Sequence, residues 1–295
     1  MRPLAWLLAA ALLLSACDRS PFPRGRFIAV ASFYPLYTLT RQVAGEHAEV
    51  LSLVPSGVEP HDWEPSPQDL KRIGRARLFV YNGAGLEPWV AKLQRDGVLK
   101  DAVVVRASEG LPLIVPEGSV KPDPHVWLDP VYAQSMVRAI ADGLVKADPA
   151  RAATYKETAN AALRRLQSLD DAFSSGLRDC SRHEIVVTHS AFAYLGKRYG
   201  LTVVPIMGMA PESEPSPAQL VAIVKFAREK KVKYIFTEPL VSPKLAETVA
   251  READAETLVL NPIEGITAAE QAAGKDYVTL MEENLKNLRT ALGCR

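Results

Sequence analysis

The sequence predicts an α/β fold of two lobes, each a four-stranded, mainly parallel sheet with flanking helices, joined by one long rigid helix. Short runs of apolar and β-branched residues alternate with amphipathic helical stretches, which is typical of consecutive βαβ units. The alternation stops at about residue 148 and restarts near residue 185. Between Pro149 and Gly176 there is no proline or glycine, so this segment predicts a helix roughly 45 Å long, at about 1.5 Å per residue.

The first lobe is predicted to contain four strands with helices between them. The strands are the apolar segments at residues 27–31, 50–54, 78–81 and 103–105. A helix is expected from about residue 35 to residue 44. Further helices are expected where a capping side chain is followed by proline at the first helical position. These dipeptides are Ser66-Pro67, Asp129-Pro130 and, at the start of the linking helix, Asp148-Pro149.

The second lobe repeats this organisation. Its strands are predicted at residues 185–188, 201–205, 234–237 and 257–260. Helix starts are predicted at Ser216-Pro217 and Ser242-Pro243, and Thr267 with Glu270 forms a capping-box pattern. The last helix is expected from about residue 275 to residue 292. Its apolar residues recur at helical spacing, at Val278, Met281, Leu285 and Leu288.

The amino-terminal segment is predicted to export and anchor the chain. Residues 1–16 have a basic start, an apolar run and small residues before Cys17, which is typical of a secretory signal peptide. The apolar run is too short to span about 30 Å of hydrocarbon. Residues 14–17 resemble the bacterial lipobox, whose cysteine is acylated and becomes the first residue of the mature chain. A plain signal peptide with an incidental cysteine is the alternative.

Export determines the predicted compartment. Asp18, after the lipidated position, resembles the inner-membrane retention signal of Gram-negative lipoproteins, so the protein is expected outside the cytoplasm, anchored to the membrane and facing the periplasm in such a cell. Cys180 and Cys294 can then be oxidised to a disulfide, with two free thiols as the alternative. The predicted segments are the signal peptide at 1–16, a tether at 17–26, the first lobe at 27–147, the linking helix at 148–178 and the second lobe at 179–295.

Composition and charge exclude several classes of protein. The chain is 48% hydrophobic and 23% charged, which excludes disordered, collagen-like and polytopic membrane proteins. Lys and Arg number 35 against 34 Asp and Glu, and no basic stripe is present. The chain therefore lacks the electrostatic footprint of a nucleic-acid-binding protein.

Three of the five histidines follow predicted strands. His61 and His125 share the pattern Pro-His-X-Trp in loops with acidic residues nearby, and His189 follows the first strand of the second lobe. Ligands of open parallel sheets bind outside the carboxyl ends of strands, so loops from both lobes can converge on one cleft. Three imidazoles suit zinc, which favours four ligands in a tetrahedron. On spacing alone, structural histidines are an equally good interpretation. His47 and His183 are interpreted as surface or packing residues.

Several segments together resemble one protein family in order and spacing. They are the lipobox, residues 57–65 around His61, residues 122–130 around His125, residues 188–192 around His189, and Thr237-Glu238-Pro239. The family is that of the metal-binding solute-binding proteins of ABC importers, the zinc and manganese uptake group. The resemblance implies a lipid-anchored protein that captures a divalent metal ion between two lobes and delivers it to a permease. It also implies a linking helix that limits hinge closure.

Carried over residue by residue, the resemblance places His61, His125 and His189 at the family's three histidine positions. In the family, the resemblance implies a glutamate at the third position of manganese-associated members and a histidine in zinc-associated ones. His189 therefore favours Zn²⁺ as cargo, with Mn²⁺ or Fe²⁺ as alternatives. At the fourth position the family commonly has Asp-Pro, whereas this sequence has Asn261-Pro262. We therefore expect Glu264 to complete the metal site, and Glu238 or water are the alternatives.

Four further residues are predicted to lie around these ligands. Asp62 and Asp129 can accept the second ring N–H of a ligating histidine, which would fix its tautomer. Glu238 is expected to support the site or to form a salt bridge, and Asn261 to lie beside it as a weak donor.

Two other functions remain as alternatives to metal transport. A zinc-dependent hydrolase would need an open coordination position and a general base, yet the sequence has no His-Glu-X-X-His helix or nucleophile-elbow pattern. A surface adhesin, an activity claimed for some relatives of the family, is the other alternative. The implied partners are an ABC permease with its cytoplasmic ATPase, and the membrane through Cys17. The chain is expected to be monomeric and not an enzyme.

Overall fold

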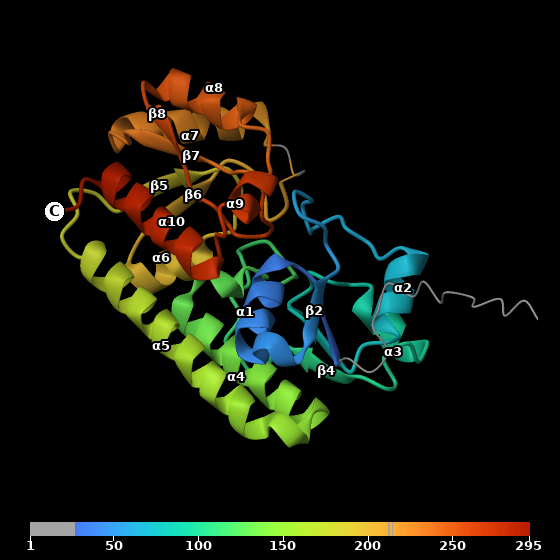
Figure 1. Ribbon diagram of the computed structural model, residues 1–295. Helices are drawn as coiled ribbons and strands as arrows, with labels where there is room; N and C mark the ends of the chain where they lie inside the picture. Colours follow the sequence, from blue (N-terminus) through green and yellow to red (C-terminus); the bar gives the residue numbers. More distant parts are fainter. Residues whose placement is uncertain (1–26, 212, 214) are drawn as a thin grey trace, which may run out of the picture.

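The computed structural model describes residues 27–211, 213 and 215–295, and it places two four-stranded sheets in two lobes (Figure 1). The first-lobe strands, in spatial order, are β2 (Glu49–Ser52), β1 (Ile28–Ala31), β3 (Leu78–Tyr81) and β4 (Val103–Arg106). The second-lobe strands, in spatial order, are β6 (Thr202–Pro205), β5 (Glu184–Val187), β7 (Tyr234–Thr237) and β8 (Glu256–Val259). Neighbouring strands pair in parallel throughout both sheets. The predicted fold class is confirmed.

Helices connect these strands and cover the sheets. The α-helices of the first lobe are α1 (Tyr34–Ala44), α2 (Pro67–Ile73), α3 (Val90–Arg95) and α4 (Pro130–Ala147). The linking helix is α5 (Ala152–Gly176), and the second lobe contains α6 (Ala193–Tyr199), α7 (Pro217–Glu229), α8 (Lys244–Ala253), α9 (Ala268–Ala272) and α10 (Tyr277–Leu292). Three short 3₁₀ turns are η1 (Gly45–His47), η2 (Val126–Leu128) and η3 (Pro149–Arg151).

Most of the predicted helix starts are confirmed by their caps. Ser66, Ser216 and Thr267 each form a capping box, and Asp129 accepts a hydrogen bond from the first turn of α4. The start predicted at Asp148-Pro149 is confirmed in position, because Asp148 is the N-cap of η3, which begins at Pro149 and continues directly into α5 at Ala152. The expected side-chain cap is not formed there, and the first turn is 3₁₀ rather than α. The carboxylate of Asp148 is used instead by Arg151 and Tyr155, whose side chains donate to it at 2.7 and 2.9 Å.

A second predicted cap, at Ser242-Pro243, is also wrong. Helix α8 begins at Lys244 after Pro243, which carries no capping side chain. Pro243 already has right-handed helical backbone angles, so the chain enters the helix without a side-chain cap.

The linking helix α5 packs against both lobes. It contacts α1 and α4 of the first lobe and α10 of the second, and it lies along one side of the whole molecule (Figure 1). Arg198 of α6 makes two hydrogen bonds to Asp170 of α5, at 2.7 and 2.6 Å. The largest cluster of buried apolar side chains runs through both lobes. The lobes therefore share one hydrophobic core rather than meeting only at a linker.

The structure describes the carboxyl-terminal end of the chain but not residues 1–26. The predicted signal peptide, the tether and Cys17 lie outside the described residues. At the other end, Cys180 and Cys294 are joined by a disulfide bond, which ties the carboxyl terminus to the segment after α5. Within the described part of the chain, no helix combines the length and the apolar character needed to cross a bilayer.

Candidate metal centre

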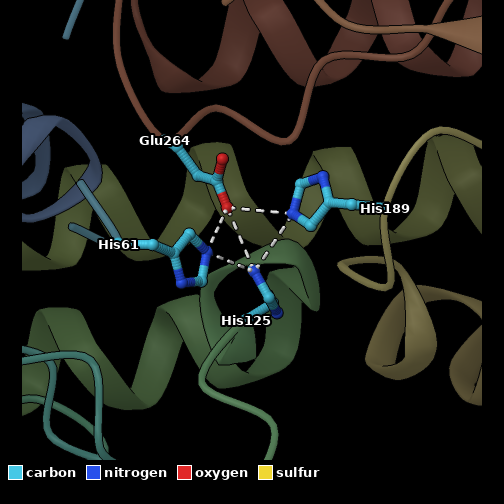
Figure 2. A group of neighbouring side chains, drawn as sticks. All are labelled: His61, His125, His189 and Glu264. Atoms are coloured by element: carbon cyan, nitrogen blue, oxygen red, sulfur yellow. Dashed lines mark hydrogen bonds and ion pairs between the residues drawn. The ribbon is translucent and has the colours of Figure 1, made fainter. Parts of the chain in front are cut away.

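Four of the predicted residues converge between the lobes (Figure 2). His61 lies in the loop after β2, and His125 is the residue immediately before η2. His189 follows β5, and Glu264 comes from the loop after β8. One possible ligand atom from each of the four residues lies within 4.8 Å of all the others. Each lobe thus supplies two side chains.

Five of the six distances between these atoms match the edges of a small tetrahedron, and the sixth pair, from His61 and His189, lies within 4.8 Å. Glu264 Oε1 lies 3.1 Å from His61 Nε2, 3.0 Å from His125 Nε2 and 3.3 Å from His189 Nε2. His125 Nε2 lies 3.2 Å from the Nε2 atom of His61 and 3.4 Å from that of His189. Four ligand atoms at about 2.0–2.1 Å from a zinc ion would be separated by about 3.3 Å. The cluster has the dimensions that one four-coordinate metal ion requires.

Two buried carboxylates set the tautomers of two buried histidines. His125 Nδ1 lies 2.7 Å from Asp123 Oδ1, and His189 Nδ1 lies 2.7 Å from Glu238 Oε2. Because an ionised carboxylate only accepts hydrogen bonds, each Nδ1 donates its proton, and in the neutral ring the Nε2 lone pair faces the cluster. The same carboxylates accept the backbone N–H groups of His125 and His189, at 2.9 and 3.1 Å. Ring and backbone are therefore held together.

The electrostatics of the cluster favour a cation. Burial alone would raise the pKa of Glu264, but the charge and hydrogen bonds of the histidines lower it well below its usual range. Burial alone would lower the pKa of His189, but Glu264 and Glu238 raise it well above its usual range. The pKa of His125 is raised against its burial in the same way, by Asp123 and Glu264. Positive charge is thus stabilised among the ligand atoms, and a divalent metal ion supplies it without protons.

A tight bend after β8 directs Glu264 into the cluster. Asn261 Oδ1 accepts the backbone N–H of Ile263 at 2.7 Å, and Ile263 adopts the left-handed conformation with φ of 59°. Asn284 of α10 holds the start of the bend, because its side chain makes two 2.7 Å hydrogen bonds with the backbone of Asn261. The departure from Asp to Asn at position 261 therefore leaves a residue that shapes the loop, and the carboxylate comes from Glu264.

Two of the residues predicted to hold a histidine ring, Asp62 and Asp129, do not do so. Asp129 does not contact a histidine ring: it caps α4, accepting the Val131 N–H at 2.8 Å, and lies 3.4 Å from Arg198 Nε. The prediction for Asp129 is wrong because its carboxylate caps the start of α4 instead of a histidine ring. The prediction for Asp62 is wrong as well, because its side chain is exposed. The acid beside His61 is Glu59, which accepts the His61 backbone N–H at 3.0 Å.

The two other predicted neighbours contact the site in different ways. Glu238 accepts from His189, as described above, and so supports a ligand. Asn261 turns its Nδ2 away from the cluster and donates to Glu270 Oε1 at 3.1 Å.

Asp123 is the supporting residue that the sequence reasoning missed. A signal for it was present, because the two histidines that the first lobe contributes to the cluster follow an acid and a proline, in Glu59-Pro-His61 and Asp123-Pro-His125. In both segments the acid accepts the backbone N–H two residues later, as in an Asx-type turn. The repeated acid-Pro-His pattern thus marks two loops that present an imidazole.

The sequence matches the family described as zinc-uptake complex component A, periplasmic, over residues 29–291. It is 38% identical over 307 residues to the high-affinity zinc uptake system protein ZnuA of Bacillus subtilis, across 97% of this chain and 96% of that protein. The zinc-binding lipoprotein AdcA of Streptococcus pneumoniae is also 38% identical, over 305 residues. That match covers 98% of this chain but 61% of AdcA, so the chain spans only part of this longer relative.

Solved structures agree with the sequence relatives. The Zn(II)-bound ZnuA-like domain of Streptococcus pneumoniae AdcA superposes with a TM-score of 0.81 at 39% identity, covering 91% of this chain and 99% of that one. The laminin-binding protein Lmb of Streptococcus agalactiae, described as bifunctional with adhesin and metal-transporting activity, gives a TM-score of 0.83 at 34% identity, over 90% and 99% of the two chains. The chain belongs to the ZnuA family, the periplasmic component A of zinc-uptake complexes.

Proposed function

We propose that this protein is the zinc-capturing component of an ABC importer and that His61, His125, His189 and Glu264 hold the ion. The observation that carries the proposal is the convergence of three imidazole nitrogens and one carboxylate oxygen at tetrahedral spacing. Zinc is the cargo that this donor set favours over manganese, because imidazole is a softer donor than the oxygen ligands that manganese prefers. Four protein ligands also suit the tetrahedral coordination of zinc.

The same geometry favours transport over hydrolysis. A catalytic zinc keeps a coordination position for water, whereas four protein atoms here occupy all the corners of a tetrahedron. Capture and release follow from the division of the ligands between the lobes. Moving the lobes apart by a small amount separates His61 and His125 from His189 and Glu264, and two ligands hold zinc far less tightly than four. Because the shared core and α5 join the lobes, we expect release by a small shift of the second-lobe loops that carry His189 and Glu264.

The expected partners are a membrane permease and its cytoplasmic ATPase, to which the protein delivers its ion. We further propose that Cys17 carries the lipid that keeps the protein at the outer face of the membrane, and that the protein works as a monomer. The lipoprotein name of the AdcA relative and the periplasmic description of the family support this location.

The test is native mass spectrometry with elemental analysis of the chain produced without residues 1–17, followed by competition of zinc against manganese. One bound zinc ion, displaced by manganese only at a large excess, is expected. Preference for manganese would overturn zinc as the cargo, and a chain that binds no metal would overturn the proposal altogether. Substitution of exposed His183 by alanine is the matched control, because it removes an imidazole that lies outside the cluster.

A further inference from the structure

A second buried polar cluster lies next to the loops that carry the first-lobe histidines. Its centre is Glu87, a buried carboxylate in the segment after β3. The carboxylate accepts three hydrogen bonds, from Ser32 Oγ at 2.6 Å, from the Asn82 N–H at 2.9 Å and from the Gly83 N–H at 3.0 Å. Burial nevertheless raises the pKa of Glu87 to about 7. Burying a carboxylate is unfavourable, so its presence here calls for a role.

Two of the three donors contact segments that lead to the proposed ligands, next to His125 and seven residues before His61. The side chain of Asn82 donates to the carbonyl of Pro124 at 2.9 Å, and Pro124 immediately precedes His125. The carbonyl of Ser32 accepts the backbone N–H of Val54 at 3.1 Å, at the point where the chain leaves β2 for the loop that carries His61. One carboxylate is therefore linked, through a single residue on each side, to both ligand loops of the first lobe.

The turn that Glu87 holds has an unfavourable backbone conformation. Gly83, Ala84 and Gly85 have φ of 80°, 51° and 87°, three successive residues in the positive-φ region. The N–H groups of Asn82 and Gly83 point at the two carboxylate oxygens of Glu87, which fix the start of this turn. An amide at position 87 would oppose at least one N–H with its own NH₂ group, since only an acceptor oxygen fits both.

We propose that Glu87 is a positioning residue for zinc capture, fixing the Asn82–Gly83 turn and Ser32 so that His125 and His61 stand at ligand spacing before the ion arrives. The inference rests on the proposed function and deepens it. The second lobe positions its own ligands by other contacts, through Glu238 for His189 and Asn261 for Glu264. Glu87 thus organises the first-lobe half of the metal site.

The test is the Glu87→Gln variant, which keeps the size of the side chain. Residues that orient metal ligands typically change affinity by about 10–100-fold when substituted, so zinc is expected to bind at least about tenfold more weakly. The visible absorption of bound cobalt(II), which reports coordination geometry, is expected to change. The matched control is Asp148→Asn, the same chemical change at another buried carboxylate of this lobe, beyond the far end of α4. It removes an acceptor for Arg151 and Tyr155 and is expected to lower stability with zinc affinity and the cobalt spectrum unchanged.

A second variant keeps the inference testable if Glu87→Gln does not fold. Asn82→Ala leaves all three hydrogen bonds to Glu87 in place and removes the side-chain bonds to the carbonyls of Pro124 and Gly83. It is expected to weaken zinc binding and to alter the cobalt spectrum. If the variants that fold are less stable but bind zinc and cobalt as the unmodified chain does, Glu87 is structural only and the positioning role is wrong. If the unmodified chain itself binds no zinc, the proposed function is wrong. Zinc binding by the unmodified chain therefore distinguishes failure of the proposed function from failure of the positioning role.

Discussion

At the scale of single residues, His125 is the centre of the cluster. Its Nε2 atom lies within 3.0–3.4 Å of Glu264 Oε1 and of the Nε2 atoms of the two other histidines. Its ring is fully buried, and its other nitrogen is committed to Asp123. The Asp123 contact thus directs His125 Nε2 toward the three other possible ligand atoms.

Substitution of His125 by alanine is expected to weaken zinc binding by orders of magnitude and to leave the metal-free fold intact. Removing the ring takes away one of four ligands, and Asp123 keeps the hydrogen bond from the backbone N–H of residue 125. Competition titration measures the affinity, and circular dichroism of the metal-free chain checks the fold. His47→Ala, on the exposed η1 turn, is the control. Unchanged affinity in His125→Ala would mean that the three-histidine site is wrong.

The fourth ligand can be assigned by two separate substitutions. Glu264→Gln keeps the shape of the side chain but replaces a charged oxygen by a neutral one. Zinc affinity is therefore expected to fall by more than about 100-fold, beyond the range of about 10–100-fold that loss of a residue orienting a ligand causes. Asn261→Ala is expected to weaken binding less, because it loosens the bend at Ile263 and leaves the carboxylate in place. Isothermal titration of both variants measures the difference. Unchanged zinc affinity in Glu264→Gln would contradict Glu264 as the fourth ligand.

The sequence, through the family resemblance, predicted the four converging residues better than the residues that hold them in place. His61, His125 and His189 stand out because few histidines are present and each follows a strand, and Glu264 was found by asking which acid could replace the missing aspartate. Supports are harder to predict, because hydrogen-bond partners are decided by backbone direction. Asp129 lies four residues after His125, yet the proline after it commits its carboxylate to the start of α4.

At the scale of secondary-structure elements, α5 shows what patterns predict and where they fail. Its length follows from a long run without proline or glycine, which any sequence reader can see. The form of its first turn does not, because Asp148-Pro149 starts the 3₁₀ turn η3 and the α-helix itself begins only at Ala152. Whether a carboxylate caps a helix or binds Arg151 and Tyr155 depends on side chains that come later in the chain.

The contact between α5 and α6 makes a prediction about acid stability. Burial alone would raise the pKa of Asp170, but hydrogen bonds from Arg198 and Tyr199 lower it below its ordinary value. A lowered pKa means that this stabilisation is complete above the ordinary carboxyl range and is lost as the pH falls through the lowered value. Asp170→Asn is therefore expected to lower the free energy of unfolding by about 2 kcal/mol at pH 7, less than for a fully buried ion pair because Arg198 is partly exposed and keeps Asp129 nearby.

Urea unfolding at several pH values measures this effect. The difference between the Asp170→Asn variant and the unmodified chain should shrink as the pH falls below about 4. A difference that stays constant on acidification would contradict an electrostatic origin. Asp171→Asn, at the exposed neighbouring position of α5, is the control and should change the stability little.

At the scale of the whole molecule, the two lobes are joined by more than the metal ligands. Trp127 Nε1 in the first lobe donates to the carbonyl of Pro262 in the second at 2.8 Å, and Tyr277 of α10 donates back to the carbonyl of Trp127. The buried apolar cluster is continuous between the lobes. The disulfide joins Cys294, which follows α10, to Cys180, which follows α5. The lobes are thus expected to unfold together, which separate lobes on a flexible linker would not do.

Zinc is therefore expected to raise the stability of the entire chain in one step. An ion that binds only the folded state stabilises it by about 2.7 kcal/mol at a free concentration 100 times the dissociation constant. For a chain of this size that raises the melting temperature by about 5–10 °C. Differential scanning calorimetry with buffered zinc, with and without a chelator, measures the shift, and His125→Ala should abolish it. Because ligands come from both lobes, a single transition should move as a whole. Two transitions of which zinc moves only one would mean that the ion is held by one lobe, and would contradict the division of the site between them.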